Sequence, residues 1–249
     1  MTRQIKKYWE EASEDYQLTC GIPIGIHYGN GAPFEDEIKL LGSLRKKKIL
    51  EIGCGGAQCG IAMAKQGADV TGIDISENQL NYAKALAKEN GVEILFHQGD
   101  IRRLTEIKSN NYDLVFSAWA LLYVDNLRSC FQEVYRVLKR GGSFVASLPH
   151  PFFRTVSPKT MKLRESYFDV GKKEIAETWN DGSNHKNVVY DHTVSELINM
   201  LLDTDFFIER IIEPDSRKKY KKDPWYNKFE VTAELAKYIP QTLILKSRK

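Results

Sequence analysis

The chain has 249 residues, of which 42% are hydrophobic and 28% are charged, and a formal net charge of +3. This composition is typical of a soluble globular protein, and the charge is too small to indicate nucleic-acid binding by itself. The apolar runs fall short of the roughly 20 residues that cross a bilayer. The charged N-terminal sequence lacks the apolar core of a signal peptide. We therefore expect a cytoplasmic protein with no membrane segment, built as one α/β domain with an insertion or as two small domains.

The four cysteines form no CxxC pair and have no histidine nearby at metal-ligand spacing. They are Cys20, Cys54, Cys59 and Cys130. Scattered cysteines of this kind are typical of reduced thiols in the cytosol rather than of a disulfide framework. We therefore predict neither a disulfide nor a metal site.

Short apolar strands alternate with helices from residue 48 to residue 149. Ser76, followed three residues later by Gln79, resembles a capping box at the start of one of these helices. The predicted strands are 48–52, 68–74, 92–100, 112–120 and 143–149, and the predicted helices are 57–66, 77–90 and 127–139. This order predicts a parallel sheet that is covered by helices on both faces.

The alternation breaks after Pro149. Residues 150–190 are rich in aromatic residues, charges and turn formers, which indicates an insertion between the fifth strand and its helix. The pattern then resumes with a helix near 193–203 and two strands, 206–212 and 242–248. The irregular basic stretch between these strands suits a hairpin-like pairing with a long connection.

Polar residues and glycines follow the first four predicted strands. The turn after the first strand reads Glu51-x-Gly53-x-Gly55, and glycines there allow positive φ and a close approach of a ligand to the backbone. The next three strand ends carry Asp74, Asp100 and Ser117. Ligands of open α/β sheets bind at the carboxyl ends of the strands, so this rim is a candidate cofactor site.

A dinucleotide site is disfavoured by one residue. The G-x-G-x-x-G pattern needs a glycine at position 58, where this chain has Gln58. A nicotinamide-dependent oxidoreductase therefore has little support. The glycines alone are also explained by a plain tight turn between a strand and a helix.

The segments LEIGCGG, GIDIS, GDI, YDLVFSAWALLYVDN and VLKRGGSFVAS resemble, in their order and spacing, the class I S-adenosylmethionine-dependent methyltransferases. The resemblance covers about residues 46–148, and the branch most similar in appearance is that of small-molecule methyltransferases like those of quinone biosynthesis. It implies a doubly wound, seven-stranded Rossmann-like sheet, mostly parallel, with an antiparallel last strand. It also implies an N-terminal helical lid (1–45) and a methyltransferase domain (46–249) with a substrate-cap insertion (150–190).

The resemblance implies S-adenosylmethionine as the cofactor. Glu51 would orient its amino-acid end, Asp74 would bind the ribose, and Asp100 would bind the adenine amino group. The implied cofactor-binding residues are Glu51, Gly53, Gly55, Asp74, Ile75, Asp100, Ile101, Ser117 and Trp119. Structural alternatives stay open: Asp100 as a helix N-cap, Glu51 as a structural hydrogen-bonding group, and Trp119 as a core residue.

Methyl transfer from a sulfonium requires the nucleophile, the methyl carbon and the sulfur in line, so positioning and water exclusion are the protein's main contributions. We predict His150, just beyond the fifth strand, as a base or substrate contact. Tyr28 lies in a segment that the resemblance folds over the cofactor, and we assign it a lid contact with a catalytic role. His150 could instead cap strand carbonyls, and a tight glycine turn could explain the stretch around Tyr28.

Aromatic residues occur at helical spacing near the N-terminus, around Tyr8, Trp9 and Tyr16. Such a stripe is usually core, but here it could roof a pocket. Together with the aromatic residues of the insertion it predicts a largely apolar chamber for an aromatic or hydrophobic metabolite. The predicted substrate contacts are Tyr16, His27, Tyr123, His150 and Phe152.

The predicted function is methyl transfer to an oxygen, nitrogen or carbon nucleophile of a small molecule, with a homodimer kept as a candidate assembly. The first alternative is an RNA, DNA or protein methyltransferase, with the lysine runs 46–48 and 218–222 as phosphate contacts. Nucleic acid is disfavoured because the fourth strand ends in SAWA and not in an Asn/Asp-Pro-Pro-aromatic sequence. The second alternative is a non-catalytic protein that binds the cofactor.

Overall fold

The computed structural model describes residues 3–157, 159–178, 182, 184–215, 217 and 234–249. The lysine run 218–222 lies outside the described residues. Within these ranges no helix combines the length and apolar character that crossing a bilayer requires. The cytoplasmic location stays a prediction.

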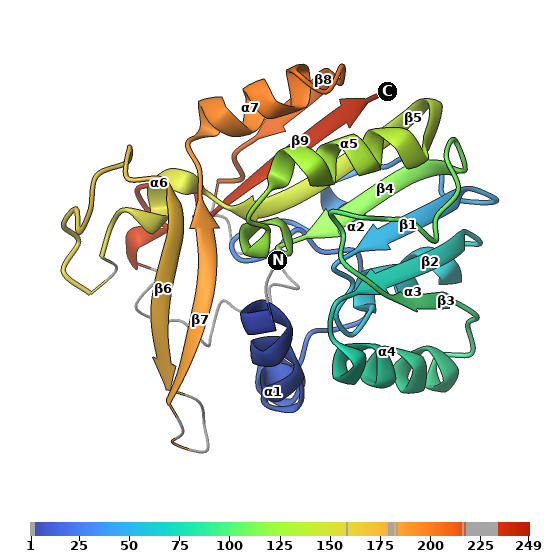
Figure 1. Cartoon of the computed structure of the whole chain (residues 1–249), viewed down its shortest axis with the longest axis horizontal. Coiled ribbons are helices and arrows are strands. Elements are labelled where there is room, and N and C mark those ends of the chain that lie inside the picture. The colour runs from blue at the N-terminus through green and yellow to red at the C-terminus, as the bar shows by residue number, and fades with distance from the viewer. Residues whose placement is uncertain (1–2, 158, 179–181, 183, 216, 218–233) are drawn as a thin grey trace.

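A seven-stranded sheet forms the centre of the protein, in the order β3-β2-β1-β4-β5-β9-β8 (Figure 1). Strand β9 is antiparallel to both of its neighbours, and the other adjacent pairs are parallel. The strands are β1 (Lys48–Ile52), β2 (Asp69–Asp74), β3 (Leu95–Gln98), β4 (Tyr112–Ala118), β5 (Leu138–Pro149), β8 (Phe207–Ile212) and β9 (Thr242–Arg248). The predicted fold class is confirmed.

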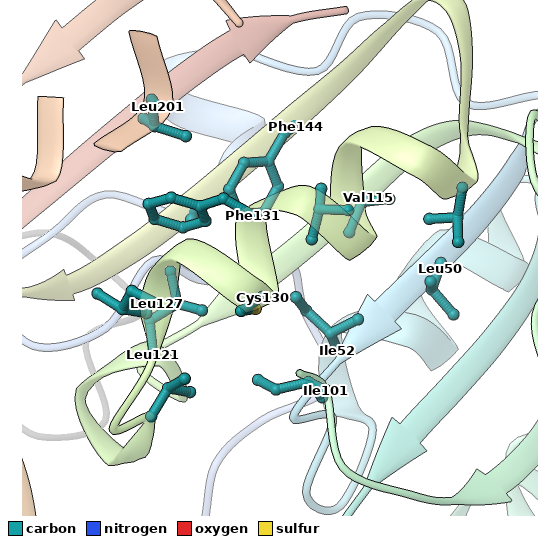
Figure 2. Packing of buried hydrophobic residues seen from close by; sticks show 14 of the residues in the cluster. Leu50, Ile52, Ile101, Val115, Leu121, Leu127, Cys130, Phe131, Phe144 and Leu201 are labelled. Carbon is teal, nitrogen blue, oxygen red and sulfur yellow. The ribbon is translucent and has the colours of Figure 1, made fainter. Parts of the chain in front are cut away.

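Helices cover both faces of this sheet. They are α3 (Gln58–Lys65), α4 (Glu77–Glu89), α5 (Leu127–Val137) and α7 (Val194–Leu202), with shorter turns at α2 (Glu35–Ile38), η1 (Leu121–Tyr123) and α6 (Pro151–Arg154). Under α5 the core is dense: Phe131 and Phe144 are essentially unexposed and their ring centroids lie 5.8 Å apart (Figure 2). Burying each ring contributes about 1.5–3 kcal/mol.

The predicted helix 127–139 is wrong at its C-terminal end. The helix stops at Val137, and strand β5 begins at Leu138, five residues before the predicted start. Leu138 pairs with Tyr112 of β4, and Gly141, at φ +76°, lies within the strand. Pairing with an existing strand therefore overrides the helical preference of this stretch.

The insertion contains an antiparallel hairpin that the sequence analysis did not predict. Strands β6 (Gly171–Thr178) and β7 (Asn184–Asp191) pair from Gly171↔Asp191 to Thr178↔Asn184. The hairpin runs beside the N-terminal helix α1 (Arg3–Cys20), which also packs on α4 (Figure 1). Helix α1 and the hairpin thus meet next to the carboxyl edge of the main sheet.

The N-terminal segment after α1 shares a core with the main sheet. Leu41 and Leu44 are buried in one cluster with Ile49 of β1 and Ile244 of β9. Residues 26–44 are therefore part of the folded body of the protein. The division into a lid at 1–45 and a domain at 46–249 stays a prediction.

Candidate active site

A cavity of about 430 Å³ lies at the carboxyl ends of β1 and β2, with α1 over it. This volume is within the range of small-molecule sites, about 300–1,000 Å³. Of the predicted cofactor residues, the cavity is lined by Glu51, Gly53, Gly55, Asp74, Ile75, Ile101 and Trp119. The predicted substrate contacts Tyr16, His27 and Tyr123 line it as well.

The glycine turn after β1 is held in a left-handed conformation that brings bare backbone to the cavity. Gly53 has φ +64° and Gly55 has φ +52°. A Cβ at Gly53 would lie 2.2 Å from the Cβ of Ala120, so there is no room for a side chain. Asp74 fixes the turn, because its Oδ2 accepts a hydrogen bond from Gly55 N at 2.9 Å and its Oδ1 accepts one from Ser76 N at 2.9 Å.

Glu51 is a buried carboxyl group at the floor of the cavity. Its side chain is 3% exposed, and its Oε2 has no hydrogen-bond partner among the described residues. Burial raises the pKa of Glu51 to about 8, a hydrogen bond from Gly60 N–H opposes this, and the nearby Asp74 adds to it. Gly60 leaves the carboxyl its space, since a Cβ there would lie 2.5 Å from Oε2. A buried oxygen without a partner favours a ligand that brings a donor or a positive charge.

Helix α1 is tied to the N-terminus of α4 by Glu10. The carboxylate accepts hydrogen bonds from Glu77 N at 2.9 Å, Asn78 N at 3.0 Å and Ser76 Oγ at 3.0 Å. Burial raises the pKa of Glu10, but the hydrogen bonds from the backbone N–H groups of Glu77 and Asn78 outweigh it, so the pKa lies below its usual value. A carboxylate from one helix therefore caps another helix, whose positive end favours it.

We expect Glu10→Ala to loosen α1 without unfolding the sheet. Loss of a cap costs about 1 kcal/mol, and hydrogen exchange of residues 3–20 should speed up while that of β1 and β4 stays slow. Because the pKa of Glu10 is depressed, its contribution is present above the ordinary carboxyl pKa and is lost as the pH falls through the lowered value. Glu14→Ala, an exposed position on the same helix, is the control. Equal rates of hydrogen exchange in α1 of both variants would contradict the role of Glu10 in holding α1 against α4.

Three buried glutamines connect α1 to the glycine turn. Gln17 Nε2 donates to Gln79 Oε1 at 2.8 Å, and Gln58 Nε2 donates to Gln17 Oε1 at 2.7 Å. Gln79 was predicted to complete a capping box with Ser76. Ser76 Oγ does accept from Gln79 N at 3.2 Å, but the Gln79 side chain instead bonds to Gln17. The side chain of Gln58 thus helps to hold α1 over the cavity.

Aromatic rings form the other wall of the cavity. Trp9 makes edge-to-face contacts with Tyr16 at 5.3 Å and with Tyr123 at 5.2 Å between ring centroids. Trp119 packs against the N-terminal segment, since a Cβ at Gly29 would lie 1.8 Å from its Nε1. Burial lowers the pKa of His27 to about 4, which keeps its imidazole neutral near neutral pH. The wall of the cavity that α1 and η1 form is therefore largely aromatic.

Several predicted site residues do not line this cavity. Asp100 accepts from Arg102 N at 2.9 Å and from the Arg102 guanidinium, which also reaches Asp125. Ser117 is fully buried and donates to the carbonyl of Ile52 at 3.1 Å. Tyr28 donates to Glu35 Oε2 at 2.6 Å. The positions of these side chains in the structure are explained by contacts within the protein.

His150 and Phe152 also lie outside the cavity lining. His150 Nδ1 accepts from Phe152 N at 3.2 Å and caps α6, while Nε2 is 2.8 Å from Glu213 Oε1. Since Nδ1 accepts, Nε2 carries the proton that is donated to Glu213. Burial lowers the pKa of His150 and Glu213 opposes this. Both ring nitrogens are therefore engaged in holding the chain after β5.

We expect His150→Ala to lower the free energy of unfolding by about 1–2 kcal/mol, because a cap and a partly buried hydrogen bond are lost. Binding of the predicted cofactor should not change. Thermal denaturation and calorimetry measure the two effects, and His150→Asn, which restores a capping group, should recover much of the stability. Normal stability together with lost catalysis would return His150 to the catalytic role predicted from the sequence.

The sequence analysis missed the three glutamines and Asn187 as lining residues. In the sequence analysis, Gln58 was considered only because it stands where the G-x-G-x-x-G pattern has its third glycine. Gln17 shares one helix with the aromatic stripe, but its partners come from elements more than 40 residues away. A charged or aromatic pattern would have drawn attention to these positions, whereas single amides in a sequence give no such signal.

Comparison with known proteins agrees with this geometry. Residues 50–146 match a family described as a methyltransferase domain. The ubiquinone biosynthesis O-methyltransferase of Bordetella avium is 30% identical over 136 residues, which are 55% of this chain and 53% of that protein. The chain thus spans about half the length of that relative.

Solved structures match over more of the chain. A crystal structure from Listeria monocytogenes, assigned to the S-adenosylmethionine-dependent methyltransferases, is 27% identical with a TM-score of 0.66 and covers 86% of this chain and 96% of its own. The cyclase SpnF shares the fold at 20% identity, with a TM-score of 0.68 over 99% of this chain and 95% of its own.

The fold and the rim are those of a Rossmann-like protein with a candidate site for a nucleoside cofactor at the carboxyl edge of its sheet. Residues 50–146 match a methyltransferase domain, and the chain resembles the S-adenosylmethionine-dependent methyltransferases in fold and sequence. S-adenosylmethionine is the cofactor named for that structure from Listeria monocytogenes. The residues present fit this group, because Glu51 offers a buried oxygen without a partner and Gly53 leaves bare backbone at the cavity.

Proposed function

We propose that this chain transfers the methyl group of S-adenosylmethionine to an oxygen, nitrogen or carbon nucleophile of a small aromatic or hydrophobic molecule. The observation that carries the proposal is the single cavity in which the cofactor rim and the aromatic wall of Trp9, Tyr16 and Tyr123 face the same space. A mostly apolar cavity of this size suits a metabolite better than a polymer segment.

The residues of the rim would hold the cofactor by its polar ends. Glu51 would accept a hydrogen bond from the ammonium group, whose charge offsets the penalty of the buried carboxylate. Asp74 already accepts two backbone hydrogen bonds, but a carboxylate has about four lone-pair sites, so it can still receive the ribose hydroxyls. The glycine turn would let the methionine part pass close to the backbone.

The cofactor supplies a methyl group on a sulfonium sulfur, which leaves readily as a neutral thioether. The protein therefore need only align the acceptor and exclude water. Helix α1 serves the second task, since Glu10 and Gln17 hold it over the cavity. His27 is a weak base at its lowered pKa of about 4. It would orient an acceptor by accepting a hydrogen bond, and the acceptor would be an amine or a group that loses its proton readily.

Methyl-labelled S-adenosylmethionine incubated with a cell extract tests the proposal. We expect label in the small-molecule fraction, and the same result from an extract cleared of macromolecules. Label only in RNA or protein would replace the proposal with the macromolecular alternative. Cofactor binding without any transfer would indicate that the cavity serves another purpose, as the cyclase activity named for SpnF illustrates for this fold.

A further inference from the structure

The insertion places one buried amide in the wall of the cavity. Asn187 lies on β7, is 3% exposed and lines the cavity together with the rim and α1. Its neighbours Val188 and Val189 are buried too, and β7 lies against both α1 and η1. These two elements carry Trp9 and Tyr123, so the amide and the aromatic wall belong to the same end of the cavity.

The charges around the cavity are distributed unevenly. Among the described residues that line it, the acidic side chains are Glu51 and Asp74, and both lie on the cofactor rim. Away from the rim the polar side chains are uncharged, and they include the amides Asn30 and Asn187, the imidazole of His27 and the hydroxyl groups of Tyr16 and Tyr123. In the described part of the wall there is thus no lysine or arginine to compensate a buried carboxylate or phosphate.

We propose that Asn187 is the specificity-determining residue of this chamber and that the chamber selects uncharged aromatic acceptors over anionic ones. The inference rests on the proposed function and narrows its substrate class. An amide both donates and accepts, so Asn187 can bind a hydroxyl or an amine of the acceptor without introducing a charge. An anion at the same place would lose its hydration and face two carboxyl groups, with only neutral donors in return.

Three phenols of nearly equal shape test the selection. They are para-propylphenol, which is neutral, tyramine, which is cationic, and para-hydroxyphenylpropionate, which is anionic. Each is titrated by calorimetry into protein saturated with S-adenosylhomocysteine, the product that remains when the cofactor loses its methyl group. We expect the neutral phenol to bind most tightly and the anionic phenol at least about tenfold more weakly. Equal or tighter binding of the anion would overturn the proposal, and so would the absence of binding by all three.

Variants at position 187 test the role of the amide. Asn187→Ala should weaken binding of para-propylphenol by about tenfold, the loss of one buried hydrogen bond. Asn187→Asp should move the preference to tyramine. The matched control is Asn184→Ala at an exposed position on the same strand, which should bind all three phenols as the wild type does.

Binding of S-adenosylhomocysteine distinguishes a failure of the proposed function from a failure of the role of Asn187. S-adenosylhomocysteine affinity is measured in the same titrations and should be equal in all variants, which also shows that they are folded. A wild type that does not bind S-adenosylhomocysteine would remove the proposed function itself. Normal S-adenosylhomocysteine binding with the same phenol affinities in Asn187→Ala and wild type would remove only the role of Asn187.

Discussion

Glu51→Gln should weaken S-adenosylmethionine binding by at least about tenfold, or 1.4 kcal/mol, while the protein stays folded. Glutamine keeps the shape of the protonated carboxyl, so the buried site is preserved. It cannot carry the negative charge that would pair with the ammonium group of the cofactor. Calorimetric titration of wild type and variant measures the difference, and Glu14→Gln at an exposed position of α1 is the control.

The wild-type affinity should depend on pH through the same group. Burial raises the pKa of Glu51 to about 8 in the free protein, so near neutral pH most molecules hold this proton. Binding of a cationic group favours the ionised form, so affinity should rise as the pH approaches 8 and level off above it. Binding near neutral pH should also release a proton, which is seen as a dependence of the heat on the buffer. A pH-independent affinity would contradict the role of Glu51.

Stability should show the opposite trend in the free protein. The folded state binds the Glu51 proton more tightly than the unfolded chain, in which the carboxyl has its ordinary pKa of 4.5. The free energy of unfolding therefore falls as the pH rises between about 4.5 and 8. Glu51→Gln should flatten this slope and be more stable than the wild type at the upper end. A variant that is less stable there would show that the carboxylate has a structural partner.

The sequence predicted the main sheet well because each of its strands is a short apolar run beside a helix with one apolar face. The errors arise where tertiary contacts decide. Residues 138–142 become strand because β4 supplies hydrogen-bond partners, and the β6–β7 hairpin pairs two segments whose sequences lack a regular apolar alternation. Local preference does not contain that information.

The rim was predictable for a different reason. Glu51, Gly53 and Asp74 occupy strand ends, and the topology of a parallel sheet brings strand ends together. Asp100 and Ser117 also occupy strand ends, yet Arg102 and the carbonyl of Ile52 engage their side chains. Topology thus places a residue at the edge, whereas the direction of its side chain depends on neighbours that the sequence pattern does not reveal.

Gly53→Ala should have the largest effect on both stability and binding. The φ of +64° disfavours any residue with a Cβ by about 1–2 kcal/mol. The new methyl group would also lie 2.2 Å from Ala120 Cβ, so the turn or η1 must move. Such overpacking adds about 1–3 kcal/mol. We expect the free energy of unfolding to fall by about 2–5 kcal/mol, and S-adenosylmethionine affinity to fall about a hundredfold, or 2.7 kcal/mol.

Gly91→Ala separates the two causes. Gly91 has φ +67°, nearly that of Gly53, but nothing lies within 4 Å of its added Cβ. The control should therefore lose only the conformational part, about 1–2 kcal/mol, and should bind S-adenosylmethionine normally because Gly91 is not one of the residues that line the cavity. Urea denaturation and calorimetry of both variants give the comparison. The expectation is contradicted if Gly53→Ala loses no more stability than Gly91→Ala and still binds S-adenosylmethionine normally. The turn could then move away from Ala120 without disturbing the cofactor, and the close packing would not be needed for the site.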